Sequence, residues 1–497
     1  MAAQLCCVDR ERPGTKTLGG RWFCDEHYAK ATYKRSGVWR SELLGIVALV
    51  IFVVAVFALD AALKPDFSRV TLMLVGVVLA LVPAALWMFV FYRQDRLEPE
   101  PVGHVVRMFV VGLALASAIG IPITNQLFRV DEWLYRDTLT NIFGSVFLIG
   151  GVEAFIVYAT VRYFIFDSAE FDERTDGVVY GTAAGLGYAT ALNLQFILGS
   201  GGAALGVGEV SVATVALAQA AFGGLLGYFL GRAKLEQEPM WWLPVGLVLT
   251  AILNGAFNLL RGQIDTGALG AASDLSSFTG LALAGGLAAI VAVVIYALVN
   301  RDIARILSGK QQAAAGDPTV GDRRANFVTV GAFVVLLVAG GLVWNNAVHS
   351  RTAFDTAGFR GEYPSTFGAA TREGDVLRVA DLLGTGAEFA ISTRPLEGGA
   401  DAKAVAAQLG GERSTDYAVY KVTDTSNVTV NGKAALRQHF ALVDSAELSG
   451  ALPQVLEGFD YIFVEGGRAV VVTLLAPTDS LADVEPQFNR FLNGLSF

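Results

Sequence analysis

The sequence is poor in the residues from which soluble catalytic sites and disulfide frameworks are built. Only 17% of its 497 residues are charged, and it contains four histidines and three cysteines. The cysteines all precede residue 25, which excludes a disulfide scaffold and suggests a reducing compartment or a metal site near the N-terminus. The polar N-terminal segment lacks the apolar core of a cleavable signal peptide, so we expect none. A net charge of -9 argues against nucleic acid as a partner.

Hydrophobic residues make up 53% of the chain and its mean hydropathy is +0.50, values typical of a membrane protein. Apolar runs of about 20 residues, long enough to cross a bilayer as helices, recur along the sequence. There are nine: Leu43–Leu63, Val70–Tyr92, Val105–Leu127, Ile142–Phe166, Gly177–Leu198, Val210–Gly231, Trp241–Leu260, Phe278–Val299 and Phe327–Trp344. We therefore expect an all-α polytopic membrane bundle, with eight spans in residues 42–300 and a ninth in residues 327–345.

Lysine and arginine predict the orientation of these spans. They are more frequent in the loops on the side of the N-terminus, including the linker 301–326, than in the loops on the other side. By the positive-inside rule the N-terminus and this linker are cytoplasmic, and residues 346–497 lie outside the cell. The sequence thus predicts a multi-pass protein of the plasma membrane, in contact with the lipid bilayer.

Residues 1–41 are predicted to form a small zinc-finger-like module. A cysteine pair precedes a Cys-x-x-His half-site, and four soft ligands suit a tetrahedral zinc ion. The candidate ligands are Cys6, Cys7, Cys24 and His27. Because a Cys-x-x-Cys knuckle is missing, Asp9 could replace one of them. The pattern resembles small treble-clef or B-box-like zinc fingers; the alternative is three free thiols and a surface histidine.

Residues 346–497 have the pattern of a soluble α+β domain. Two hairpins are indicated by the turn sequences Asn431-Gly432 and Glu465-Gly-Gly, which accept the positive φ of tight turns. The other expected strands and helices are Glu388–Thr393, Tyr417–Thr423, Tyr461–Val464, Ala469–Leu474, Ala402–Leu409 and Ser480–Leu492. The outline of this domain resembles PsbP/Mog1-like domains, which are mostly binding or accessory modules.

Few strongly polar side chains interrupt the predicted spans, and none of them is a histidine. They are Glu153, Asn193, Gln195, Gln219, Asn254 and Asn258. A carboxylate in hydrocarbon is costly, so Glu153 is a candidate functional residue; the alternative is a structural acid paired with Asn193, Gln219 or Asn254. Amides are poor zinc ligands and cannot act as general bases.

Two of the predicted spans carry glycine at every fourth position. The stripes are Gly177, Gly181 and Gly185 in one span and Gly223, Gly227 and Gly231 in another. Such stripes let helix backbones approach closely in lipid. We expect these glycines to pack the bundle around Glu153 without taking part in chemistry.

Four stretches between Tyr92 and Leu260 together resemble one family. They are Asp95-Arg-Leu-Glu-Pro-Glu-Pro101, Glu170-Phe-Asp-Glu-Arg-Thr-Asp176-Gly-Val-Val-Tyr-Gly, Gly224-Leu-Leu-Gly-Tyr-Phe-Leu-Gly231 and Asn254-Gly-Ala-Phe-Asn258. In combination they are similar to the motifs of the PrsW family of intramembrane metalloproteases, in the CAAX-protease-like superfamily. The resemblance implies a multi-span helical bundle that binds a metal ion and cleaves membrane proteins.

The resemblance assigns metal binding and water activation to acidic and histidine side chains, of which this chain keeps only Glu153. The second glutamate of the family's pair falls on Ala154, and the glutamate of its glycine-rich helix falls on Leu192. The family's two histidines fall on Gln219 and Asn254. We therefore expect no metal in the bundle and a catalytically degenerate pseudoprotease with Glu153 as the sole remnant.

The acids of the family's loop motifs have two interpretations. They are Asp95, Glu98, Glu100 and Asp176. The loop that contains the first three could bind a divalent cation or gate substrate, or it could be a segment in which prolines end a helix and the acids stay solvated.

Three functions remain open. The first is a non-catalytic membrane regulator or adaptor in signalling, with a membrane-protein or envelope partner and a cytosolic protein bound through the N-terminal module. The second is an active intramembrane peptidase with an altered site around Glu153, using Asp176 or Asp95. The third is a transporter or channel. This class requires an inverted repeat or broken helices with charges at mid-membrane, and the sequence shows no convincing repeat and only one deep charge.

Overall fold

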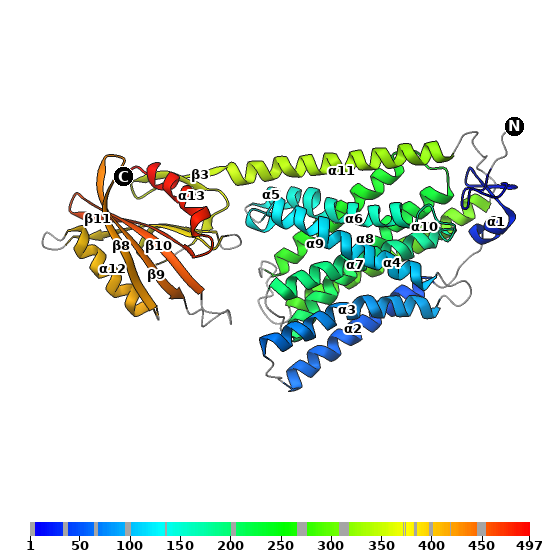
Figure 1. The fold of residues 1–497 in the computed structure, drawn as a ribbon, viewed down its shortest axis with the longest axis horizontal. Coiled ribbons are helices and arrows are strands. Elements are labelled where there is room, and N and C mark those ends of the chain that lie inside the picture. Colours follow the sequence, from blue (N-terminus) through cyan, green and yellow to red (C-terminus); the bar gives the residue numbers. More distant parts are fainter. Residues whose placement is uncertain are drawn as a thin grey trace. The chain divides into compact units, whose positions relative to one another are not determined.

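The computed structural model describes residues 5–32, 38–63, 68–94, 101–134, 137–199, 205–265, 276–307, 318–370, 372, 374–381, 385–396, 401–417, 419–444 and 454–497. The chain forms two compact units. The first contains residues 1–128 and 142–341, and the second contains residues 129–141 and 342–497. Figure 1 labels their helices and strands.

The N-terminal module of the first unit is a hairpin followed by one helix. Strands β1 (Lys16–Leu18) and β2 (Arg21–Phe23) pair antiparallel. Gly19 and Gly20 join them with φ angles of 58° and 82°, as a tight hairpin turn of this kind requires. Helix α1 (Asp25–Thr32) begins with two acidic residues, which favour the positive end of its dipole.

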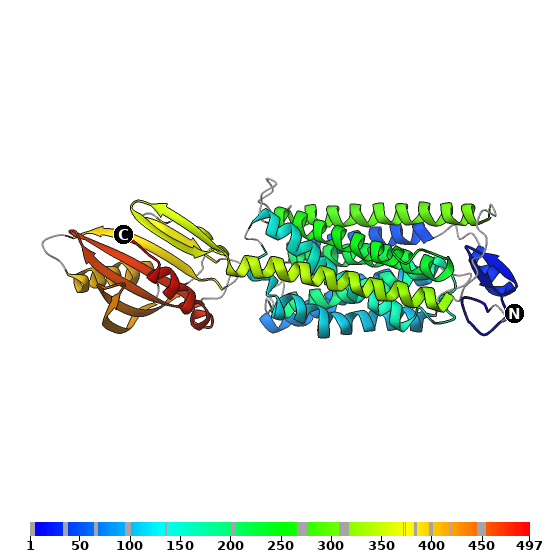
Figure 2. The ribbon, with the colours of Figure 1, turned by 90° about the horizontal axis from the view of Figure 1, so that it is seen from above.

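The rest of the first unit is a bundle of long helices that lie side by side (Figure 2). The helices are α2 (Val38–Leu63), α3 (Arg69–Gln94), α4 (Val102–Leu115), α5 (Thr138–Gly144), α6 (Gly151–Phe164), α7 (Arg174–Gly199), α8 (Leu205–Leu235), α9 (Trp242–Asp265), α10 (Ser276–Leu307) and α11 (Pro318–His349). Short segments interrupt or continue them: η1 (Ala116–Gly120), η2 (Pro122–Leu127) and η4 (Ser145–Gly150). A further short helix, η3 (Val130–Glu132), belongs to the second unit.

The prediction of a helical membrane part is confirmed. Within the described residues, six segments are long and apolar enough to cross a membrane: Val102–Leu127, Thr138–Phe164, Val210–Leu235, Trp242–Arg261, Thr279–Leu298 and Arg323–His349. Val47–Leu59 and Val70–Leu86 are shorter apolar helical segments at two other predicted spans. The remaining predicted span, Gly177–Leu198, lies within α7.

The helices on both sides of the predicted linker 301–326 run further than the sequence predicts. Helix α10 extends to Leu307 and α11 already begins at Pro318. Proline suits the first position of a helix because its missing N–H would have no partner there. Alanine, arginine and leucine are good helix formers, which carries α10 past its apolar run.

Glycines set the distance between α7 and α8. A Cβ added at Gly181 would lie 2.2 Å from the carbonyl oxygen of Gly223, and one at Gly177 would lie 2.2 Å from that of Gly227. Any larger residue would force the two backbones apart. The predicted glycine stripes therefore pack against each other, as expected.

The second unit is built on a seven-stranded antiparallel sheet of order β5-β6-β7-β11-β10-β9-β8. Its strands are β5 (Gly368–Ala369), β6 (Asp375–Ala380), β7 (Glu388–Pro395), β8 (Val419–Val430), β9 (Lys433–Asp444), β10 (Gln454–Glu465) and β11 (Arg468–Pro477). Strands β3 (Arg351–Thr356) and β4 (Phe359–Pro364) form a separate pair. Both predicted hairpin turns are present, with positive φ at Asn431 and Gly432 and at Gly466 and Gly467.

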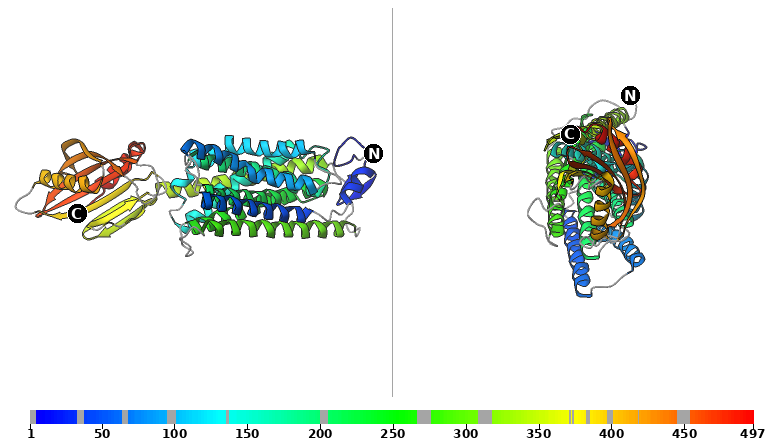
Figure 3. Two further views of the ribbon diagram at one scale, coloured as in Figure 1. Left: turned by 90° about the horizontal axis from the view of Figure 1, so that it is seen from below. Right: turned by 90° about the vertical axis from the view of Figure 1, so that its left-hand side faces the viewer.

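Helices cover both faces of this sheet (Figure 3). In β10, Tyr461 and Phe463 pack with α13 (Leu481–Asn493), whereas Ile462 between them packs with α12 (Ala402–Asp416). Successive side chains of a strand point to opposite faces, so one strand serves both layers. The prediction of a C-terminal α+β domain is confirmed.

Candidate functional site

Glu153 is the third residue of α6 and follows a π-helical segment, η4. Its side chain lies inside the bundle, and the residue is only 5% exposed. Single π-helical turns inside helices often occur at functional sites, because they change which side chains face the interior. The local structure therefore places the carboxylate among neighbouring helices.

Two side-chain amides meet the Glu153 carboxylate. Gln219 of α8 donates its Nε2–H to Oε2 of Glu153 at 2.5 Å, and Asn254 of α9 donates its Nδ2–H to the same oxygen. Asn258, one turn further along α9, donates its Nδ2–H to Oδ1 of Asn254 at 3.0 Å. The described side chains thus form a cluster of one buried carboxylate from α6 and three amides from α8 and α9.

Small residues bring these helices close enough for the cluster to form. A Cβ added at Gly185 would lie 2.3 Å from the carbonyl oxygen of Gln219. One added at Gly150 would lie 2.2 Å from the carbonyl oxygen of Ala251. The glycines therefore hold α7 against α8, and the helix of Glu153 against α9, near the residues that reach the carboxylate.

The other predicted bundle residues make different contacts. Asn193 is buried and donates its Nδ2–H to the carbonyl oxygen of Val212 at 3.1 Å. Gln195 is half-buried. Ala154 and Leu192 pack in the hydrophobic core of the bundle.

Asp176 lies at the start of α7. Its Oδ2 accepts the backbone N–H groups of Asp172 at 2.9 Å and Glu173 at 2.6 Å. A carboxylate that reaches back in this way satisfies donors left free at a helix start, as in a capping box. Asp176 therefore orders the loop between α6 and α7. The other acids of the family's loop motifs, Asp95, Glu98 and Glu100, lie outside the described residues.

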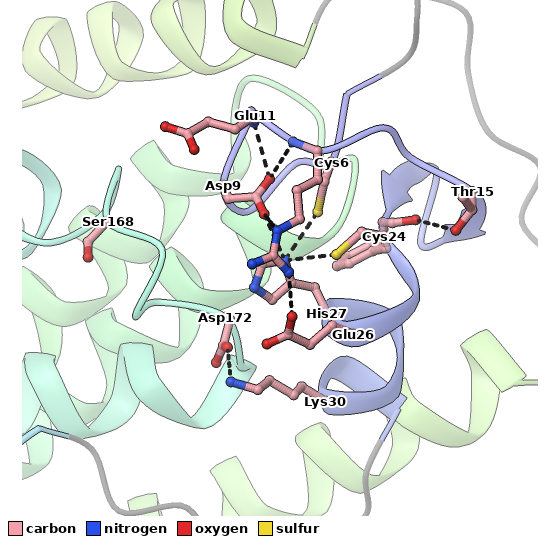
Figure 4. Close-up of polar contacts among 12 residues, drawn as sticks. Cys6, Asp9, Glu11, Thr15, Cys24, Glu26, His27, Lys30, Ser168 and Asp172 are labelled. Carbon is pink, nitrogen blue, oxygen red and sulfur yellow. Dashed lines mark hydrogen bonds and ion pairs between the residues drawn. The ribbon is translucent and has the colours of Figure 1, made fainter.

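A second candidate site lies in the N-terminal module (Figure 4). One ligand atom from each of four residues lies within 4.8 Å of the others: Cys6, Asp9, Cys24 and His27. Nδ1 of His27 is 3.4 Å from Sγ of Cys6, 3.3 Å from Sγ of Cys24 and 3.6 Å from Oδ2 of Asp9. Sulfur and nitrogen ligands of one tetrahedral zinc ion lie about 3.5 Å apart, given Zn–S and Zn–N bonds of about 2.3 and 2.0 Å. The group could hold a metal ion.

Cys7, one of the four predicted ligands, is not part of this group. It is buried in the hydrophobic cluster of the module, and burial raises the pKa of its thiol to about 12. Asp9, the alternative ligand, joins the group instead. Its Oδ1 accepts the backbone N–H groups of Glu11 and Arg12, which leaves Oδ2 directed at His27.

Comparison with known proteins identifies the bundle. A family model described as PrsW family intramembrane metalloprotease matches residues 100–299. Protease PrsW of Geobacillus kaustophilus (strain HTA426) is 30% identical over 174 residues, which are 34% of this chain and 72% of that protein. Protease PrsW of Bacillus subtilis (strain 168) is 27% identical over 177 residues, which are 34% of this chain and 75% of that protein.

A C-terminal part of the chain is weakly similar in structure to cyanobacterial PsbP (CyanoP) from Synechocystis sp. PCC 6803. The match has a TM-score of 0.24 and 11% identity, and it covers 30% of this chain and 92% of that one.

The family of the bundle follows from the PrsW relatives. The protein from Geobacillus kaustophilus is 30% identical to this chain over 72% of its own length. The chain belongs to the PrsW family of intramembrane metalloproteases.

Proposed function

We propose that this PrsW-family protein is a pseudoprotease that acts as a membrane regulator or adaptor. The observation that carries the proposal is the bonding of the Glu153 carboxylate by the amide N–H groups of Gln219 and Asn254. Those amides give one oxygen of a buried acid two hydrogen-bond donors, which is a structural arrangement. The bundle then serves as a frame that holds a segment of another membrane protein.

The donors that the described residues place at Glu153 do not fit a hydrolytic zinc centre. Such a centre uses about three protein ligands, drawn from histidine, carboxylate and thiolate, and an open position for water. Here one carboxylate faces two amides whose hydrogen atoms point at it. A single glutamate cannot serve both as metal ligand and as the general base that activates water, and an amide is a poor zinc ligand and cannot act as a general base.

The proposal assigns each part of the chain a side of the plasma membrane and a partner. The N-terminal module lies in the cytoplasm, where a cytosolic protein binds it. Residues 346–497 lie outside the cell and bind an envelope component or the external part of a membrane protein. The distribution of lysine and arginine in the loops supports this orientation.

The alternative is an active intramembrane metallopeptidase with an altered site around Glu153. Membership of a protease family and the surviving carboxylate favour it. It predicts a metal ion in the bundle and cleavage of a membrane-protein substrate that requires Glu153.

Metal analysis of the full chain separates the two functions. The starting variant is His27→Ala, so that a metal bound in the N-terminal module is not counted. The proposal predicts no metal in this variant, and no difference when Glu153→Gln is added. Cells that express the wild-type chain or Glu153→Gln are then compared for new N-termini of membrane proteins. A bundle metal and a cleavage product that both disappear in Glu153→Gln would establish the peptidase.

A further inference from the structure

The N-terminal module contacts the end of α8 within the same compact unit. Leu235, the last residue of α8, is fully buried in the hydrophobic cluster of the module, beside Cys6 and Phe23. The carbonyl oxygen of Gly19 accepts the backbone N–H of Gln237 at 2.7 Å. The hairpin of the module is therefore packed directly against the chain that leaves α8.

Arg21 strengthens this contact by satisfying the end of the helix. Its guanidinium donates to the carbonyl oxygens of Ala233 at 2.7 Å and Glu236 at 2.9 Å. The last carbonyls of a helix have no partner within the helix, and a cation also favours this negative end of the dipole. Arg21 thus caps α8 from the module.

Helix α1 of the module contacts the other neighbouring segment, the loop between α6 and α7. Lys30 donates its Nζ–H to Oδ2 of Asp172 at 2.9 Å, a contact visible in Figure 4. Arg174 donates to the carbonyl oxygen of Ala31 at 3.1 Å and pairs with Glu236 at 2.9 Å. The Arg174 and Glu236 side chains are 3% and 1% exposed, so this pair depends on the module and the bundle staying together.

We propose that Cys6, Asp9, Cys24 and His27 bind Zn²⁺ as a structural site, and that the bound ion locks the module onto α8 and the loop between α6 and α7. The described part of the module, residues 5–32, is shorter than the roughly 40 residues below which a domain usually needs a disulfide, a metal or a partner. Its cysteines are free. The metal and the buried Leu235 together supply the stabilisation that the small hydrophobic core of the module cannot provide alone.

The donor atoms select zinc over the common oxygen-binding cations. Two thiols and an imidazole are soft ligands, whereas Mg²⁺ and Ca²⁺ take oxygen ligands. Three of the four side chains are buried, with Cys6, Cys24 and His27 at 0%, 6% and 5% exposure, and the Asp9 side chain is 11% exposed. Such burial is expected for a structural site without an open position. Oδ2 of Asp9 lies 3.6 Å from the ring nitrogen of His27 and 3.5 Å from Nε of Arg12, so this oxygen already faces positive or hydrogen-bonding groups where a cation would sit.

The lock also affects the bundle, because α8 and the loop after α6 belong to, or adjoin, the helices on which Gln219 and Glu153 lie. Helix α8 contains Gln219, and the loop between α6 and α7 joins the helix of Glu153 to its neighbour. Zinc occupancy therefore fixes one end of these helices. Loss of zinc releases that end without any change at the cluster itself.

Metal analysis of the detergent-purified full chain tests the ligands. The expected content is about one Zn²⁺ per chain in the wild type. Cys24→Ser and His27→Ala should both reduce it to background, while Cys7→Ala should retain it, because Cys7 shares the same core but lies outside the group. A wild-type chain that takes up no zinc, or a Cys7→Ala chain that loses it as completely as Cys24→Ser, overturns the assignment.

Hydrogen–deuterium exchange of the full chain tests the lock. Removing zinc with a chelator should speed exchange of the Gln237 amide, which donates to Gly19, by about tenfold or more, and zinc should restore it. Arg21→Ala should also speed this exchange while keeping zinc bound, which separates docking from folding of the module. Unchanged exchange after zinc removal, with zinc content at background, refutes the lock.

Discussion

Replacing Glu153 with alanine tests whether the buried cluster is structural. The substitution removes the oxygen that accepts the amide N–H groups of both Gln219 and Asn254. A buried donor left without an acceptor costs about 1–3 kcal/mol, so two of them cost about 2–6 kcal/mol. We expect the free energy of unfolding to fall by that amount, with the cavity left by the side chain acting in the same direction.

Glu153→Gln is the matched variant, because it preserves the shape of the side chain. Its carbonyl oxygen can still accept both amide hydrogens. It loses the extra strength of bonds to a charged acceptor, but it also removes a charge from the bundle interior. We expect the free energy of unfolding to stay within about 1 kcal/mol of the wild type.

Both variants are measured in the full chain in one detergent, by thermal unfolding followed with circular dichroism and by metal analysis. An alanine variant as stable as the wild type would refute the structural role of the cluster. A glutamine variant that loses a metal ion along with its stability would show that Glu153 is a ligand, and the pseudoprotease proposal would be wrong.

Three further predictions concern packing and charge. Gly181→Ala should lower the free energy of unfolding by about 1–3 kcal/mol, because the new Cβ would lie 2.2 Å from a backbone oxygen of α8. Asp460→Ala should lower it by about 3–5 kcal/mol, because it leaves Arg413, bonded to both carboxylate oxygens, without its partner in the interior. In Glu412→Gln, the free energy of unfolding should fall less steeply than in the wild type as the pH is lowered below 4.5. The hydrogen bond from Arg394 lowers the pKa of Glu412, so its stabilising effect is present above its ordinary pKa of 4.5 and is lost as the pH falls through the lower folded value.

Thermal unfolding of the full chain checks all three, each with its own control. Gly286→Ala on α10 is the control for packing, since a Cβ there meets nothing within 4 Å; an equal effect of both alanines would contradict the close-packing argument. An Asp460→Ala chain that unfolds like the wild type would show that the pair is dispensable. An acid profile unchanged by Glu412→Gln would show that this carboxylate is not a source of the pH dependence.

The sequence predicted those parts of the fold that depend on local chemistry. Asn431-Gly432 and the paired glycines after Glu465 can adopt positive φ, so both hairpins were visible in the sequence. The four-residue spacing of glycine likewise predicted a close helix contact. Helix ends were less predictable, as at Pro318, because apolar runs mark the part that lies in lipid and not the whole helix.

The sequence predicted less of the two candidate sites, because their geometry depends on which helices meet. It named Asn193, Gln219 and Asn254 as possible partners of Glu153, and only the packing shows which amides reach the carboxylate. In the module, a run of two cysteines could not show that one side chain enters the core while Asp9 turns toward His27. Nothing in the composition of α8 signals that its last residue completes the core of the module.

Under the proposed function, the bundle has lost hydrolysis and kept its fold, and the contacts of α8 show why the fold does not depend on hydrolytic residues. Its glycine face meets backbone oxygens of α7, so that contact does not depend on the chemical groups of the site. Its end is held by Leu235 and by the cap from Arg21, again away from the site. At the site, the fold requires only that the buried Glu153 has hydrogen-bond donors. Two neutral amides meet that requirement, so under the proposed function the bundle needs no hydrolytic metal to keep this packing.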